Sequence, residues 1–176
     1  MAESAFAVNV PEAEPYVGAL RSALDPTAKL GVPAHITVLY PFMSPELITS
    51  AILDQARGAF SEITSFAFRL ANVRRFPGAL YLEPDPEGPF IRLTEALVER
   101  FPRYLPYGGL HKSIAPHLTI AQAGEEEHNA AERQVIASLP PSGIQALCRE
   151  VVLIENSSGR WRQMQAFTLP AANRLV

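Results

Sequence analysis

Cysteine is almost absent from this sequence. The single cysteine, Cys148, can form no disulfide within the chain, and no CxxC motif or cysteine–histidine cluster suggests a bound metal. We therefore expect Cys148 to be a small buried residue. We also expect the protein to be cytoplasmic, because thiols stay reduced in that compartment.

Long apolar runs and an excess of basic residues are missing as well. No apolar stretch approaches the roughly 18 residues that a membrane-spanning helix needs, and the N-terminus MAESAFAVNV lacks the basic and apolar regions of a secretory signal. The 15 Lys and Arg residues against 18 Asp and Glu residues give a net charge of −3. We therefore expect no membrane partner and no long duplex nucleic acid, whereas a small phosphorylated substrate is compatible with this charge.

Hydrophobic residues, by contrast, make up 48% of the 176 residues. This share can form a sizeable core, and we expect a single globular domain over residues 1–176. The 16 prolines lie mostly between periodic segments. The patterns predict strands at 4–10, 35–40, 65–76, 79–84, 117–121, 144–155 and 160–169, and helices at 11–24, 44–60, 89–101 and 124–139.

The order of these elements repeats. A strand with the tripeptide His-x-Thr, then a helix and a hairpin, occupy residues 35–83 and again residues 117–169. His35 lies 43 residues before Gly78 at the tip of its hairpin, and His117 lies 42 residues before Gly159. We infer a duplicated supersecondary unit within one bilobed domain, because no linker separates the halves.

The two His-x-Thr tripeptides are the chemically distinctive feature. Side chains at positions i and i+2 of a strand point to the same face. His35 and Thr37 therefore share one face of the first strand, and His117 and Thr119 share one face of the second. If a pseudo-two-fold axis relates the halves, these polar faces meet across a cleft that contains two imidazoles and two hydroxyls.

Such a set of groups suits phosphoester chemistry. Displacement at phosphorus needs a base on the attacking oxygen and an acid on the leaving oxygen, and two imidazoles can supply both near neutral pH. The threonine hydroxyls can donate to the non-bridging oxygens, where charge develops. This chemistry needs no metal, and the sequence offers no cluster of metal ligands. We therefore predict neither a metal nor another cofactor.

The stretches HITVLYPF and PHLTIA, at corresponding points of the repeat, resemble the two-histidine (2H) phosphoesterase superfamily. That superfamily includes bacterial RNA 2',5'-ligase-like proteins and cyclic nucleotide phosphodiesterases, and the resemblance extends over nearly the whole chain. It implies a bilobed, duplicated α+β fold, with two antiparallel-rich sheets, outer helices and a central groove that both motifs face. It also implies that His35 and His117 are catalytic and that Thr37 and Thr119 bind phosphate. The substrates of the family are 2',3'-cyclic phosphates or 2',5' linkages of RNA or nucleotides.

The chain departs from the family pattern at one position. Relatives often carry a basic residue after the second motif, as in His-x-Thr-x-x-Arg, where this chain has Gln122. This glutamine removes one possible phosphate contact and argues against long RNA as the substrate.

Several further residues allow both a structural and a functional interpretation. His111 and Lys112 precede the second motif and either touch substrate or belong to a solvated loop. His128, beside an acidic run, is expected on the surface of a helix.

Some aromatic and basic residues are similarly ambiguous. Aromatic side chains can stack on a base or belong to the core; the candidates are Phe42, Phe76, Tyr107 and Trp161. The basic stretches 74–76 and 160–162 occupy matching hairpins, where they form either rims of the groove or solvated hairpin edges.

We predict a monomeric, metal-independent phosphodiesterase that hydrolyses a 2',3'-cyclic phosphate or a related nucleotide or RNA phosphodiester. Its partner would be a small nucleotide, or an RNA terminus that carries a cyclic phosphate. One alternative is RNA 2',5' ligation, the same chemistry run in reverse. The other is a nucleotide-binding module without turnover. The sequence leaves open which histidine is the acid and which is the base.

Overall fold

The computed structural model describes residues 2–110 and 113–172. The strands are β1 (Ser4–Asn9), β2 (His35–Leu39), β3 (Phe66–Phe76), β4 (Ala79–Asp85), β5 (Leu118–Ala121), β6 (Ile144–Cys148), β7 (Glu150–Glu155) and β8 (Arg162–Thr168). The α-helices are α1 (Glu14–Leu24), α2 (Pro26–Lys29), α3 (Ser50–Phe60), α4 (Gly88–Arg100) and α5 (Glu125–Ser138). Short 3-10 helices occupy Pro11–Ala13, Pro45–Leu47 and Pro106–Gly109.

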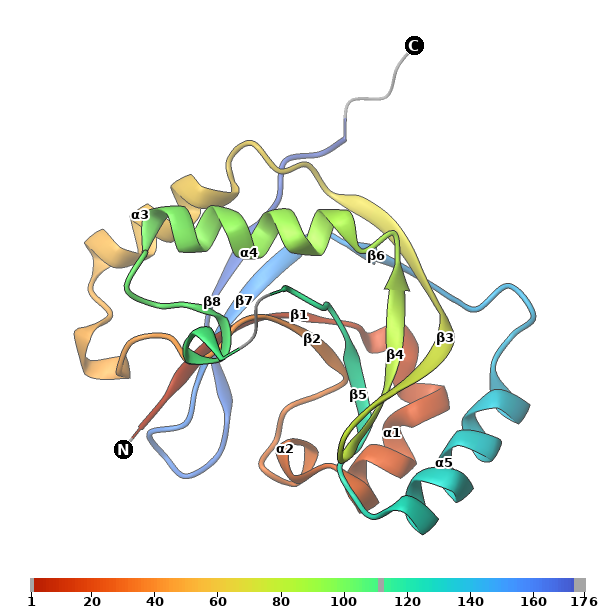
Figure 1. Cartoon of the computed structure of the whole chain (residues 1–176). Coiled ribbons are helices and arrows are strands. Elements are labelled where there is room, and N and C mark those ends of the chain that lie inside the picture. Colours follow the sequence, from red (N-terminus) through yellow and green to blue (C-terminus); the bar gives the residue numbers. More distant parts are fainter. Residues whose placement is uncertain (1, 111–112, 173–176) are drawn as a thin grey trace.

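The strands of the described chain form two four-stranded antiparallel sheets. Their orders are β2-β1-β7-β8 and β5-β4-β3-β6 (Figure 1). The predicted α+β class with two antiparallel sheets is confirmed. The strands that carry the two His-x-Thr motifs, β2 and β5, hold equivalent end positions in their sheets.

The duplication is clearest as strand, helix, His-x-Thr strand, helix. This order occurs as β1-α1-β2-α3 and again as β4-α4-β5-α5. Each half also contributes to the sheet of the other half, since β3 joins the sheet of β5, and β7 and β8 join the sheet of β2. The halves are therefore interlocked, and the two motifs belong to a structure built by both.

The helix that precedes each motif strand likewise packs against the motif strand of the other half. Helix α1 contacts β5, and helix α4 contacts β2. The Thr94 hydroxyl, on α4, donates a 2.8 Å hydrogen bond to the Val38 carbonyl in β2. This packing places each motif strand against a helix from the other half.

The predicted strand over 144–155 is wrong in one respect, because the chain changes sheets within it. Strand β6 pairs with β3, whereas β7 pairs with β1 and β8. Burial alternates along β6 but is nearly continuous along β7, which lies in the interior of its sheet. The polar residues Arg149 and Glu150 mark the passage between the sheets.

Two local predictions also need correction. The helix expected to start at Ser44 begins at Ser50, where the Thr49 hydroxyl accepts a hydrogen bond from the Ile52 N–H, while Pro45–Leu47 forms a separate 3-10 turn. His128 is buried rather than exposed, and its Nε2 accepts a 3.2 Å hydrogen bond from the Ala123 N–H. It belongs to the inward stripe of α5 with Ala131 and Val135, at helical spacing.

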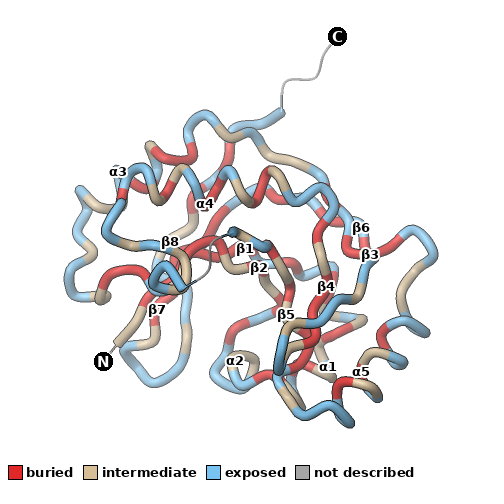
Figure 2. Tube along the Cα trace, in the orientation of Figure 1, coloured by how far each residue is buried: buried red, intermediate tan, exposed pale blue. Residues whose placement is uncertain are grey.

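The core is shared by both sheets and the inner faces of the helices, and exposed residues concentrate in loops and on outer helix faces (Figure 2). Phe6 lies at its centre, with ring centroids of Phe42, Phe60 and Phe167 between 4.9 and 6.1 Å away. Each fully buried side chain of this kind stabilises the fold by about 1.5–3 kcal/mol. This core rigidly supports the strands that carry the motifs. Within residues 2–110 and 113–172, no helix is long and apolar enough to span a membrane.

Candidate active site

The two motifs have the alternating burial that the sequence predicts. In β2, Ile36 and Val38 are buried, while His35 and Thr37 are only partly buried on the opposite face. Along the second motif, Leu118 and Ile120 are buried in the same way, and His117 and Thr119 are partly buried. Strands β2 and β5 lie beside each other without forming a ladder (Figure 1). The fold therefore brings the four predicted residues together.

Both imidazoles are held by the same backbone contact. His35 Nδ1 lies 2.8 Å from the Pro33 carbonyl oxygen, and His117 Nδ1 lies 2.7 Å from the Ala115 carbonyl oxygen. A carbonyl only accepts, so Nδ1 donates in both cases. In a neutral ring this bond leaves Nε2 as the basic nitrogen. The two histidines thus share one mode of orientation, with Nδ1 protonated in both.

The environment keeps His35 neutral. Burial, followed by the positive charge of Arg21, lowers the pKa of His35 from 6.5 to about 4. The nearby His117 adds to this effect, whereas the hydrogen bond to Pro33 and the charge of Asp25 oppose it. At neutral pH, His35 is therefore able to accept a proton.

Aromatic rings surround His117. The ring centroids of Phe76 and Tyr81 lie 5.2 and 5.4 Å from the imidazole, both in edge arrangements. These two rings stack on each other with centroids 4.2 Å apart. Of the aromatic residues considered from sequence, Phe76 thus lies at the site, as part of the wall that orients His117.

Tyr107 also reaches the site. Its side chain is hydrogen-bonded to Thr37, and its backbone N–H donates a 2.6 Å hydrogen bond to the Tyr40 carbonyl. Tyr107 has φ 50° and ψ 35°, a left-handed conformation that is uncommon for a tyrosine. Such conformations concentrate at functional sites, where the surrounding structure enforces them.

A cavity of about 1140 Å³ opens beside these residues. Thr37 and His117 line it, as do the aromatic side chains of Tyr40, Phe76 and Tyr107. His35 and Thr119, which share the strand faces of Thr37 and His117, are not among its described lining residues.

The remaining two aromatic candidates, Phe42 and Trp161, have structural roles. Phe42 is buried in the core, and Trp161 packs against Tyr40 in a small separate cluster.

None of the described residues that line this cavity is Lys or Arg, so the arginines of the two hairpins are not part of its lining. Arg75 instead pairs with Glu132 and donates a 2.8 Å hydrogen bond to the Asn129 side chain. Arg162 pairs with Glu155. The interpretation as solvated hairpin edges therefore fits better. His111 and Lys112 lie outside the described residues.

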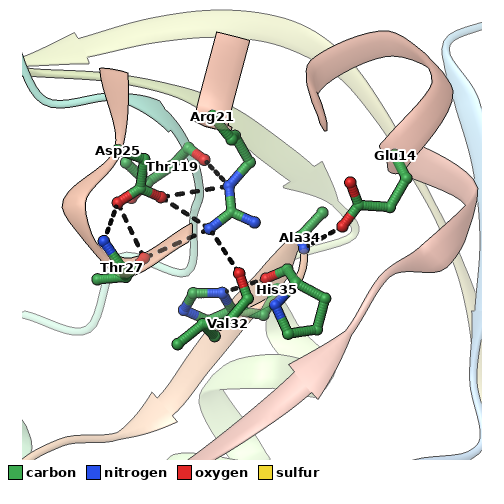
Figure 3. A network of polar contacts seen from close by, with 9 residues as sticks. Glu14, Arg21, Asp25, Thr27, Val32, Ala34, His35 and Thr119 are labelled. Atoms are coloured by element: carbon green, nitrogen blue, oxygen red, sulfur yellow. Dashed lines mark hydrogen bonds and ion pairs between the residues drawn. The ribbon is translucent and has the colours of Figure 1, made fainter. Parts of the chain in front are cut away.

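Sequence reasoning missed Arg21. This residue of α1 is 2% exposed, and its Nε donates a 3.1 Å hydrogen bond to the Thr119 carbonyl of the second motif (Figure 3). The sequence signal that could have identified it is an arginine at helical spacing to the apolar residues Val17 and Leu24.

Among the described residues, no group of three or more His, Cys, Asp or Glu side chains is arranged to hold a metal ion.

A family model described as the 2'-5' RNA ligase superfamily matches residues 10–160. The chain therefore belongs to this superfamily of two-histidine phosphoesterases, as its motifs indicate. A search of curated proteins found no match.

Solved structures share the fold. TT0787 of Thermus thermophilus superposes with a TM-score of 0.63 at 19% identity, covering 97% of this chain and 100% of that chain. Escherichia coli LigT in apo form gives a TM-score of 0.62 at 20% identity, covering 96% and 97%. E. coli LigT complexed with 3'-AMP gives 0.58 at 17% identity, covering 96% and 98%. At these identities the likeness concerns the fold alone.

Proposed function

We propose that this protein is a metal-independent phosphodiesterase that opens a 2',3'-cyclic phosphate, or a related nucleotide phosphodiester, by hydrolysis. The observation that carries the proposal is the symmetric pair of histidines. Each is fixed through Nδ1 on a backbone carbonyl beside a cavity that can hold a nucleotide. Two imidazoles oriented alike are the minimum set for concerted proton removal and proton delivery.

In this mechanism, His35 is the general base and His117 the general acid. His35 Nε2 takes a proton from the attacking water, whose oxygen forms the new bond to phosphorus. His117 gives a proton to the ribose oxygen as its bond to phosphorus breaks. The lowered pKa of His35 supports this assignment, because the base must start neutral.

The two threonines would stabilise the charge that develops on the phosphoryl oxygens. Their hydroxyls share the strand face of the histidines. Tyr107 is hydrogen-bonded to Thr37 and would orient that hydroxyl before substrate arrives. Such preorganised donors act most strongly where water is excluded.

The substrate we propose is small. The cavity beside His117 is largely apolar and aromatic, which suits a nucleobase. The complex of E. coli LigT with 3'-AMP supports a nucleotide ligand by likeness of fold. We further propose that residues 1–176 act as one monomeric domain in the cytoplasm.

RNA 2',5' ligation remains the second candidate, because the matched family is described by that activity. Ligation is the same chemistry with a ribose hydroxyl as nucleophile and a cyclic phosphate as the electrophile. Two observations make hydrolysis the better proposal. Gln122 stands where relatives often carry a basic residue, and two glutamates, Glu95 and Glu99, line the cavity.

The test is an assay of purified protein with the four nucleoside 2',3'-cyclic monophosphates in the presence of EDTA. The wild type is expected to turn over, and His35→Ala and His117→Ala are each expected to lose about 10²–10⁴-fold in kcat/KM. His128→Ala is the matched control, since this third histidine lies on α5 and bonds Ala123. Tight nucleotide binding without turnover would instead establish the binding-module alternative. Loss of activity in EDTA, restored by Mg²⁺ or Zn²⁺, would contradict the metal-free mechanism.

A further inference from the structure

A buried arginine connects the two His-x-Thr segments. Arg21 Nε lies 3.1 Å from the carbonyl oxygen of Thr119, within the second motif. Its Nη2 lies 3.5 Å from the carbonyl oxygen of Val32, three residues before His35 (Figure 3). One planar guanidinium thus spans backbone groups from both halves of the site.

The guanidinium is itself held by a buried carboxylate. Asp25 Oδ2 accepts from Arg21 Nε at 3.2 Å and from Nη2 at 2.7 Å, and the two side chains are 0% and 2% exposed, respectively. The other oxygen of Asp25 accepts from the backbone N–H and the hydroxyl of Thr27 at 2.9 and 2.8 Å. Since both carboxylate oxygens are engaged, the position of Arg21 is closely determined.

Other contacts of α1 reach the same two segments. Glu14 Oε1 accepts a 2.6 Å hydrogen bond from the Ala34 N–H, directly before His35. The Leu24 carbonyl accepts a 2.9 Å hydrogen bond from the Gln122 N–H, just after β5. Helix α1 is therefore attached on one side to the first motif and on the other to the second.

We propose that Arg21, held by Asp25, is a positioning residue that fixes the two His-x-Thr strands relative to each other and so sets the geometry of the acid–base pair. It does not touch the substrate. This inference rests on the proposed function and deepens it. Thr94 makes the counterpart contact from α4 to the Val38 carbonyl, so each motif strand is bonded by a buried side chain of the other half.

The pKa of His35 provides a second measurement that tests the proposal, because it depends on the charges around this residue. Arg21 lowers the pKa of His35, Asp25 raises it and His117 lowers it. A variant that keeps the charge but loses the geometry should therefore keep His35 neutral at pH 7, while it impairs turnover.

Arg21→Lys is that variant, since an ammonium lacks the planar array of donors that reaches both carbonyls. We expect a folded protein whose kcat falls on the order of 10- to 100-fold, because small displacements of catalytic groups are costly. We expect KM to change less than about 3-fold, since ground-state binding is not the target. The His35 pKa, followed by imidazole NMR, should stay well below 6.5.

The double variant Arg21→Met/Asp25→Leu removes the buried pair without leaving a lone charge, a change that folded proteins often tolerate. It should show the same loss of kcat. The matched control is Asp54→Leu/Arg57→Met, which removes an exposed pair on α3 and should retain wild-type kcat.

Full kcat in folded Arg21→Lys, with only the melting temperature lowered, would overturn the proposal. Should the double variant not fold, Arg21→Lys decides alone.

If the wild type shows no turnover, the proposed function fails independently of the role of Arg21. The positioning role of Arg21 is then tested by binding of inorganic phosphate. Phosphate should shift both histidine signals in the wild type but only one of them in Arg21→Lys, with a Kd within about 3-fold of the wild type. Equal shifts of both signals in Arg21→Lys would again refute the positioning role.

Discussion

At the scale of single residues, orientation rather than residue type distinguishes the site. A histidine in a strand is common, but the carbonyl contacts of His35 and His117 at 2.8 and 2.7 Å fix both rings in the same way. The alternation of HITVL and HLTIA correctly predicted which side chains share a face, because strand periodicity is a local property. The carbonyl contacts themselves depend on the bend of the preceding residues, which no periodicity encodes.

Tyr107 offers a residue-scale prediction. Tyr107→Phe keeps the ring in the cavity and removes its hydrogen bond to Thr37. A hydrogen bond of this kind contributes about 0.5–1.5 kcal/mol, so kcat/KM should fall about 2- to 10-fold. The assay is steady-state hydrolysis of a cyclic nucleotide, with Tyr104→Phe, which packs on Phe42, as control. If Tyr107→Phe retains the wild-type kcat/KM, the hydrogen bond between Tyr107 and Thr37 does not contribute to catalysis.

At the scale of secondary-structure elements, the end of β7 carries a second prediction. Glu155 is 1% exposed and accepts hydrogen bonds from the Ser157 N–H at 2.7 Å and from Arg162. The contacts to Ser157 and Arg162 lower the pKa of Glu155 from 4.5 to about 2. Glu155→Gln should therefore cost about 1.5–3 kcal/mol of unfolding free energy at pH 7.

The loss of unfolding free energy in Glu155→Gln should depend on pH, in a direction set by the lowered pKa of Glu155. A carboxyl whose folded pKa is lowered stabilises the fold above its ordinary pKa, and this contribution is lost as pH falls. The difference between wild type and Glu155→Gln should shrink from pH 4.5 toward pH 2 in urea unfolding experiments. Glu150→Gln, on the exposed start of β7, is the control. A difference that stays constant with pH would mean that the ionised carboxylate is not responsible.

The elements also show where sequence reasoning stops. Each predicted strand and helix has a counterpart, but the single strand expected over 144–155 is two strands, β6 and β7, and the helix expected from Ser44 begins at Ser50. Which strands and helices pack against one another was harder to predict. The passage of the chain from β6 to β7 between sheets, and the packing of α1 on β5, depend on contacts between distant segments. A strand-forming pattern such as that of 144–155 does not encode which sheet each of its parts joins.

At the scale of the whole molecule, the charge around the cavity predicts a preference among substrates. Glu95 and Glu99 line the cavity, and none of its described lining residues is Lys or Arg. A substrate with an additional phosphate should therefore be disfavoured. We expect a nucleoside 2',3'-cyclic phosphate to be cleaved faster than its 5'-phosphorylated form.

The double variant Glu95→Gln/Glu99→Gln should narrow that difference by about 3- to 10-fold, and 1 M salt should have a similar effect by screening. Glu125→Gln/Glu126→Gln on α5, away from the cavity, is the matched control. If the preference is the same in all three proteins and at all salt concentrations, the two glutamates do not select the substrate.

In the proposed mechanism, the two histidines act in opposite protonation states, His35 neutral and His117 protonated. The most direct test is the pH dependence of kcat/KM in EDTA, which reports the ionisation of the free enzyme. With the pKa of His35 lowered from 6.5 to about 4, the base stays neutral as pH falls through 6, so activity should decline only as pH approaches about 4. Activity should also decline at alkaline pH, when the acid loses its proton. A profile that is flat from pH 4 to 9 would contradict two-histidine catalysis, and an acidic limb centred at 6.5 would contradict His35 as the base.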